Sequence, residues 1–271
     1  MVEIKVNLEQ GNGVFYTHAI DFIGCIARAD SKSKAIDQLL QDAKEYSAWL
    51  LTQEIGKLFR ETAEDITKGI NNLKIIEEVT DVPRLKETGR PITLFKTDQE
   101  PLSEELFEEC LTVLNLLNQK LLRTVFPFSE EERKKEIILN SCSINEHIEH
   151  LCQKERFFIS RFGIEIEQMF LEAINMTVEE LDSLPMLEKI VEIRKGTIAV
   201  LKAYFPKMKD KVFRSADYTD FPEEPWTFKK VIRLIIEYER EQIKTIENLI
   251  KELQKQKQAK EEEGEEKGKK K

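Results

Sequence analysis

Residues 2–20 read VEIKVNLEQGNGVFYTHAI, and this stretch decides the fold of the N-terminal part of the chain. Apolar side chains alternate strictly with polar ones over 2–8, which is the period-2 pattern of a half-buried strand. The tripeptide Gly-Asn-Gly at 11–13 is typical of a tight turn that tolerates positive φ. We therefore expect 14–20 to pair back on the first strand and 23–29 to supply a third strand.

The spacing of apolar residues changes from 2 to 3.6 after this meander, which indicates a helix capped by Asp30 or Ser31. Its apolar face comprises Ala35, Ile36, Leu39, Leu40, Ala43, Tyr46 and Leu50. Helical character is expected to continue, with a break, until Gly69 and the residues that follow it. Short strands at 73–79 and 92–96 would complete the sheet, so residues 1–98 are predicted to form a small α+β domain.

The chain changes character at 98–102, because no strand pattern follows until the C-terminus. Residues 103–255 are predicted to be a four-helix bundle with a core separate from that of residues 1–98. The first helix is expected to end before Pro127, and the second to run from the capping box of Ser143 and Glu146 to Gly163. The third is expected to run from Pro185 to Pro206, and the fourth to begin after Thr227. The predicted fold class is therefore α+β.

The composition excludes several functional classes. The 271 residues include 42 Lys and Arg against 51 Asp and Glu, which gives a net charge of −9. An acidic balance disfavours nucleic acid as a partner, because binding to phosphates needs a clustered basic surface. We expect no membrane span, a cytoplasmic location and four reduced cysteines, since there is no long apolar run and no CxxC spacing. Residues 256–271 are highly charged and are expected to be a disordered tail.

Two histidines and two polar residues of the fourth helix are the candidates for a site in the bundle. His147 and His150 are on the second helix, and Tyr238 and Gln242 are inward i and i+4 positions on the fourth. A phenol and an amide are poor ligands for a transition metal. The alternative for both histidines is packing at the rim of the core with one hydrogen bond.

Glu155 and Arg194 are charges that lie on apolar stripes of the second and third helices. A buried carboxylate needs a partner, so the two side chains are expected to form a structural ion pair. The alternative is that Arg194 lies at the mouth of the bundle and binds an anion. No GxSxG, GxGxxG or GxxxxGK[ST] motif is present in the sequence.

The second and fourth helices resemble those of the DinB-like family. Residues 142–158, CSINEHIEHLCQKERFF, resemble the family's second helix, and residues 226–242, WTFKKVIRLIIEYEREQ, resemble its last helix. The resemblance implies an up-down-down-up four-helix bundle, which in several members is a divalent-metal, thiol-dependent transferase or isomerase. It places His150 at a metal-ligand position, and it places Tyr238 and Gln242 where the family usually has two histidines.

The N-terminal part resembles HicB-like domains in residues 15–18, FYTH, and 21–25, DFIGC. The resemblance covers roughly residues 1–98 and implies a β-meander followed by a helix. Family antitoxins usually add a DNA-binding module, and this chain has no visible counterpart. We expect the fold to transfer without the antitoxin role.

The leading hypothesis for function is a binding or interaction protein with a degenerate metal site, in which His150 is the only retained ligand position. Its bundle cleft would be lined by His147, His150, Glu155, Arg194, Tyr238 and Gln242 and could hold a small molecule. No cofactor is expected. The alternative is a thiol transferase or hydrolase of the DinB-like type, either metal-free or dependent on Zn or Ni. A homodimer is expected in either case.

Overall fold

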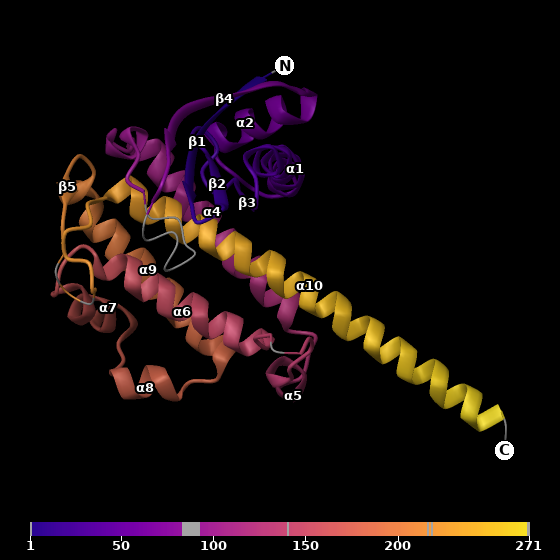
Figure 1. Ribbon diagram of the computed structural model, residues 1–271. Coiled ribbons are helices and arrows are strands. Elements are labelled where there is room, and N and C mark those ends of the chain that lie inside the picture. Colours follow the sequence, from indigo (N-terminus) through magenta and orange to yellow (C-terminus); the bar gives the residue numbers. More distant parts are fainter. Residues whose placement is uncertain (1, 83–92, 140, 216, 218, 270–271) are drawn as a thin grey trace.

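The computed structural model describes residues 2–82, 93–139, 141–215, 217 and 219–269. A four-stranded sheet with two helices forms the N-terminal part, and a set of long helices forms the rest (Figure 1). The α+β class expected from the sequence is therefore confirmed.

The sheet has the strand order β3-β2-β1-β4. β1 (Val2–Gly11) pairs antiparallel with β2 (Val14–Ala19) and parallel with β4 (Ile70–Val79), and β2 pairs antiparallel with β3 (Ile26–Ala29). The predicted turn between the first two strands has positive φ at both Asn12 and Gly13. The strands β3 and β4 are consequently the two edges of the sheet.

The strand expected at 92–96 is not observed in the described part of this segment. Residue 92 lies outside the described residues, and Lys96–Gln99 form a short 3-10 helix, η1. Phe95 is fully buried just before it, and the Asp98 carboxylate accepts a hydrogen bond from the Phe95 amide at 3.2 Å. The segment is therefore ordered by one buried aromatic ring and a local turn.

Two helices accompany the sheet, α1 (Lys32–Leu50) and α2 (Lys57–Lys68). Ser31 caps α1 by accepting a hydrogen bond from the Lys34 amide, as expected from the sequence. α1 packs on one face of the sheet, where the Thr17 hydroxyl donates to the Ala35 carbonyl at 3.2 Å. The opposite face, which carries His18, contacts α10 (Phe228–Lys269) and Phe95.

The remaining chain contains four long helices and three short ones within the described residues. Their bounds are α4 (Glu104–Val125), α5 (Glu130–Lys134), α6 (Ile144–Ser160), α7 (Ile166–Ile174), α8 (Val178–Ser183), α9 (Met186–Met208) and α10 (Phe228–Lys269). β5 (Val212–Phe213) and β6 (Trp226–Thr227) pair between α9 and α10. The predicted capping box of Ser143 and Glu146 begins α6. None of the described helices has both the length and the apolarity needed to cross a membrane.

Contacts between the four long helices set their relative directions. α4 and α10 are parallel, α6 and α9 are parallel, and α6 runs against α10. Phe107 with Phe228 and Lys120 with Glu247 join α4 to α10. Glu149 with Lys189 and Phe162 with Tyr204 relate α6 to α9. Phe158 with Trp226 and His147 with Gln242 relate α6 to α10.

The expectation of two separate cores is wrong, because α10 lies between the sheet and the other bundle helices. One cluster of buried apolar side chains extends from Ile4 of β1 to Leu253 of α10. Gly24, with φ +97°, lies so close to α10 that an added Cβ would be 2.6 Å from Ile236 Cγ2. A helix in this position buries apolar side chains around its whole circumference. In α10 these include Val231, Ile232, Ile235 and Ile236.

The structure also differs from the expected disordered tail at 256–271, since α10 continues as helix to Lys269. Glu, Lys, Gln and Ala dominate this segment, and all four are good helix formers. The beginning of the segment is held to the bundle, because Gln256 donates to the Ile137 carbonyl at 2.9 Å and Lys257 pairs with Glu132.

Candidate functional site

Glu155 and Arg194 lie together at the centre of the bundle, each only 3% exposed. The Arg194 guanidinium donates hydrogen bonds to Glu155 and, at 2.7 Å, to Glu239. Thr197 donates to the second oxygen of Glu155 at 3.0 Å. The geometry supports the ion-pair interpretation, and it contradicts an anion site at the mouth of the bundle because Arg194 is not accessible.

The third member of this triad, Glu239, was not predicted from the sequence. Burial raises the pKa of the Glu239 carboxyl to about 7, and the neighbouring charge of Glu155 adds to the effect of burial. Oε1 of Glu239 has no hydrogen-bond partner among the described residues. The triad therefore carries one more buried carboxylate than its single guanidinium can neutralise.

His147, rather than His150, faces α10. The His147 Nδ1 atom is 2.7 Å from the amide oxygen of Gln242, whereas His150 is exposed, with its ring centroid 6.3 Å from that of His147. A helix turns by about 100° per residue, so His147 lies ~60° and His150 ~120° from the fully buried Ile144. The sequence-based placement of His150 against the fourth helix is therefore wrong.

The six predicted residues do not come together around one cleft. Glu155 and Arg194 are buried in the triad, His147 and Gln242 bond to each other, and Tyr238 packs half-buried against the core. Across the part of the chain that the structure describes, no group of three or more His, Cys, Asp or Glu is placed to hold a metal ion.

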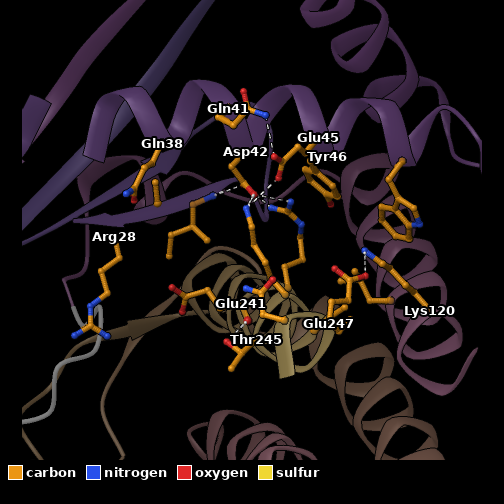
Figure 2. A pocket seen from close by; sticks show the side chains of 18 residues that line it. Arg28, Gln38, Gln41, Asp42, Glu45, Tyr46, Lys120, Glu241, Thr245 and Glu247 are labelled. Carbon is orange, nitrogen blue, oxygen red and sulfur yellow. Dashed lines mark hydrogen bonds and ion pairs between the residues drawn. The ribbon is translucent and has the colours of Figure 1, made fainter. Parts of the chain in front are cut away.

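A groove of about 530 Å3 lies elsewhere, between α1 and α10 (Figure 2). Residues 26–28 of β3 form part of its lining, and α4 contributes Leu117 and Lys120. The α1 wall includes Gln38, Gln41, Asp42 and Glu45, and the α10 wall includes Arg240, Glu241, Lys244 and Thr245. The groove therefore joins the two parts of the chain.

Ion pairs connect the two walls in one half of the groove. Asp42 accepts hydrogen bonds from Arg240 at 2.9 and 3.1 Å, and Glu45 pairs with Lys244 at 3.0 Å. The Arg240 guanidinium also lies 3.6 Å from the ring centroid of Tyr46, a cation-π contact. These contacts fix the relative position of α1 and α10.

The other half of the groove presents two charged side chains that form no ion pair among the described residues, although the Arg28 guanidinium lies 5.5 Å from the ring centroid of Tyr16. Among the described residues, neither the Arg28 guanidinium nor the Glu241 carboxyl has a hydrogen bond or an ion pair, and Gln38 lies on the opposite wall (Figure 2). Burial and the negative charge of Glu237 raise the pKa of Glu241 to about 7. This half of the groove can therefore accept both positive and negative ligand groups.

The free edge of β3 faces the groove. In an antiparallel ladder, residues that exchange hydrogen bonds alternate with residues whose amide and carbonyl point away from the partner strand. Ala19 donates to the Cys25 carbonyl at 3.0 Å, so residues 26 and 28 are of the second kind. The Ile26 amide accordingly bonds to Asp42 in the groove at 3.2 Å. It follows that the amide and carbonyl of Arg28 point towards the groove.

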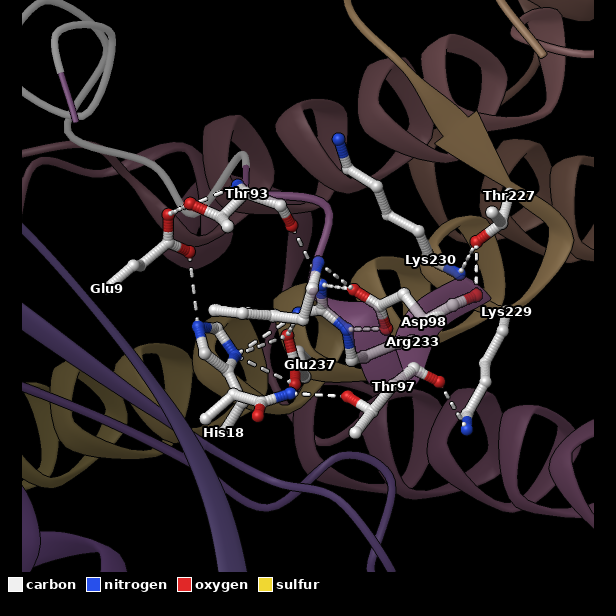
Figure 3. Close-up of polar contacts among 12 residues, drawn as sticks. Glu9, His18, Thr93, Thr97, Asp98, Thr227, Lys229, Lys230, Arg233 and Glu237 are labelled. Atoms are coloured by element: carbon white, nitrogen blue, oxygen red, sulfur yellow. Dashed lines mark hydrogen bonds and ion pairs between the residues drawn. The ribbon is translucent and has the colours of Figure 1, made fainter. Parts of the chain in front are cut away.

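A buried polar cluster centred on His18 joins β2 to α10 (Figure 3). His18 lies between two carboxylates, with Nε2 3.2 Å from Glu9 and Nδ1 3.0 Å from Glu237. Arg233 bonds to Glu237 at 3.1 Å and to both oxygens of Asp98 at 3.0 and 2.8 Å. None of these five side chains is more than 6% exposed. The cluster is closed to ligands and is structural.

The charge state of His18 follows from its neighbours. Burial lowers the pKa of His18, but the charge of Glu237 and the hydrogen bonds to Glu237 and Glu9 outweigh burial and raise it to about 9. His18 is therefore an imidazolium at neutral pH, and both of its nitrogen atoms donate to carboxylates.

The cluster and the groove were not predicted from the sequence, although α10 carries a signal for them. Arg233, Glu237 and Arg240 recur at i, i+4 and i+7, so they share one face of an otherwise apolar helix. A charged face within an apolar run indicates a second contact surface with buried polar partners. The residues near α10 in the sequence do not indicate which distant side chains are those partners.

Comparisons with known proteins do not assign a family. No family model and no curated protein matches the chain. Among solved structures, YfiT from Bacillus subtilis, a probable metal-dependent hydrolase with an unusual four-helix bundle topology, aligns with 14% identity and a TM-score of 0.39. The alignment covers 57% of this chain and 91% of YfiT. At this TM-score the similarity supports no conclusion about function.

Proposed function

We propose that this protein is a binding protein whose ligand is an extended peptide segment in the groove between α1 and α10. The observation that carries the proposal is the direction of the Arg28 amide and carbonyl, which point from the free edge of β3 into the groove. An extended chain can add to such an edge, where main-chain hydrogen bonds provide affinity and side-chain contacts provide specificity.

The dimensions and rigidity of the groove suit this role. Its volume of about 530 Å3 lies within the range of roughly 300–1,000 Å3 that is usual for ligand sites. The Asp42 and Arg240 pair holds the two walls in place before any ligand arrives. A preformed groove lowers the ordering cost of binding.

The two charges that form no ion pair suggest the kind of peptide. Side chains of an added strand would alternate between the α1 wall and the α10 wall. Arg28 and Glu241 both belong to the part of the groove next to α10, and each can bind a side chain of opposite charge. We therefore propose a polar segment that carries both an acidic and a basic residue.

Two substitutions at one position test the proposal. Arg28→Pro removes the outward-pointing amide without breaking the β2–β3 ladder, and proline is tolerated on edge strands in this orientation. Arg28→Ala keeps the amide and removes the charge. Heptapeptides selected on the native protein from a random phage library, measured by fluorescence anisotropy, should bind Arg28→Pro about tenfold more weakly or worse. Their loss on Arg28→Ala should be confined to peptides with an acidic residue.

Two results would contradict the proposal of a peptide that adds to β3 in the groove. Equal binding to native protein and Arg28→Pro, with the fold of the variant intact by circular dichroism, would refute strand addition. Selected peptides that are insensitive to both Arg28 variants and to Glu241→Gln would show that the groove is not the binding site.

The alternative, a metal-dependent or metal-free thiol transferase or hydrolase, rests on the bundle residues. The side chains present do not fit a metal site, because one imidazole, one phenol and one amide form a weak ligand set. We propose that the site is a degenerate one in which His147 faces α10. The DinB-like and HicB-like resemblances and the cytoplasmic location remain predictions.

Restoring the missing imidazoles tests the degenerate site. The double substitution Tyr238→His with Gln242→His should create zinc or nickel binding that is absent from the native protein, as measured by calorimetric titration. Adding His147→Ala should abolish this binding, whereas adding His150→Ala should not, because His150 is exposed. Tight, stoichiometric metal in the native protein would instead favour the enzyme.

A further inference from the structure

β4 is the second edge of the sheet and is ten residues long. It pairs with β1 on one side, with one register shift between Ile70 and Asn72 and another at Ile76, between Ile75 and Glu77. Within the described ranges no backbone hydrogen bond reaches its other side from outside the sheet. A long edge strand is a template for pairing with another strand. Figure 1 shows β4 along the outer margin of the N-terminal part, at the edge of the sheet opposite β3.

The side chains of β4 alternate between two environments. Leu73, Ile75 and Val79 are half-buried on one face, whereas residues 72, 74, 76 and 78 are exposed on the other. Ile76 is 43% exposed, and it lies between the charged residues Lys74 and Glu78. This edge therefore offers a second strand both unpaired backbone groups and an apolar side chain.

We infer that two copies of this chain associate by antiparallel pairing of their β4 strands, about a twofold axis that passes beside Ile76. This inference is independent of the proposed peptide groove, which lies at the opposite edge of the sheet. The product is a continuous eight-stranded sheet, since each copy contributes four strands.

Charge complementarity selects the register. In a continuous sheet, residues directly opposite each other share a face, so an exposed residue of one strand must face an exposed residue of the other. With the two Ile76 side chains opposite each other, Lys74 of each copy faces Glu78 of the other. The neighbouring registers would place Lys74 or Glu78 opposite Ile76.

On the half-buried face, the same register would place Leu73 of one copy opposite Val79 of the other, and Ile75 opposite Glu77. Opposite-charge pairs across strands contribute roughly 0.2–1 kcal/mol each, and like charges in the same positions are destabilising. Within its own chain Glu78 already pairs with Lys32 at 2.6 Å. Lys74 has no such pair among the described residues, so it is available to a second copy.

Charge reversal tests this register by light scattering coupled to size-exclusion chromatography. The native protein should be a dimer at micromolar concentration. Lys74→Glu and Glu78→Lys should each weaken self-association at least tenfold, because each variant places like charges opposite each other twice. An equimolar mixture of the two variants should form a heterodimer, since both cross-strand pairs are then of opposite charge.

Three controls separate this surface from other causes. Lys32→Ala removes only the intrachain partner of Glu78 and should remain dimeric, as should Arg28→Pro at the other edge of the sheet. The double variant Lys74→Glu with Glu78→Lys should regain the dimer. A native protein that is monomeric at these concentrations would overturn the inference, and so would a dimer that is unaffected by both single reversals.

Discussion

Replacing Arg194 with Met is expected to lower the free energy of unfolding by about 3–5 kcal/mol, because it leaves buried carboxylates without a compensating charge. Glu155 and Glu239 both lose their guanidinium partner, and both are buried at the centre of the bundle. Urea denaturation at pH 7.5, followed by circular dichroism, measures the change.

A matched variant distinguishes loss of charge balance from loss of packing. Replacing all three members of the triad, with Arg194→Met, Glu155→Leu and Glu239→Leu together, should recover most of the stability, since no buried charge remains. Glu239→Gln alone should be neutral or stabilising above pH 7, because burial raises the pKa of that carboxyl to about 7. A loss in the triple variant as large as that in Arg194→Met would show that packing, rather than charge, accounts for the effect.

Raising the pH from 6.5 to 9 is expected to reduce the stability of the native protein by up to about 3 kcal/mol through His18. The folded-state pKa of His18 is about 9 and its ordinary value is 6.5. A raised histidine pKa means that folding favours the protonated form. The stabilisation is therefore complete below pH 6.5 and is lost as the pH rises through 9.

His18→Gln should abolish this pH dependence, because glutamine has no titrating group and can still bond to Glu9 or Glu237. Urea denaturation at pH 6.5 and at pH 9.5 gives the change in the free energy of unfolding for the native protein and for His18→Gln. The raised pKa values of Glu239 and Glu241 act mainly between pH 4.5 and 7, so a background that carries both Glu239→Gln and Glu241→Gln separates the contribution of His18. A native protein as stable at pH 9.5 as at pH 6.5 would contradict an imidazolium in the cluster.

Local patterns were sufficient to predict the secondary structure of most of the chain. The alternation over 2–8, the turn at 11–13 and the capping box of Ser143 each depend on residues within a few positions of one another. None of these signals requires the identity of a partner from a distant part of the chain. The tail shows the limit of this reasoning, because its charge predicted disorder while its helix-forming residues continue α10.

The predictions about the site depended on how each helix is rotated about its own axis. A small error in this rotation changes which side chains face the neighbouring helix. The sequence placed His150 on the inner face of α6, less than one helical turn from its observed position. In the structure His150 is exposed, and His147 is the histidine that contacts Gln242. Glu155 and Arg194 were expected to pair because a buried charge requires a partner wherever it lies. That requirement did not identify Glu239 as the second carboxylate.

The sequence by itself determined the α+β class, most of the strands and helices, and the need for buried charges to be paired. Only the tertiary structure decided which groups pair, because the partners are far apart in the chain. His18 and Glu237 are separated by 219 positions, and Asp42 and Arg240 by 198. Such contacts form when α10 packs between the sheet and the bundle, and the same packing creates the groove and leaves β3 and β4 as free edges. No pattern of neighbouring residues encodes that packing, since it depends on the shapes of surfaces that only the folded chain brings together.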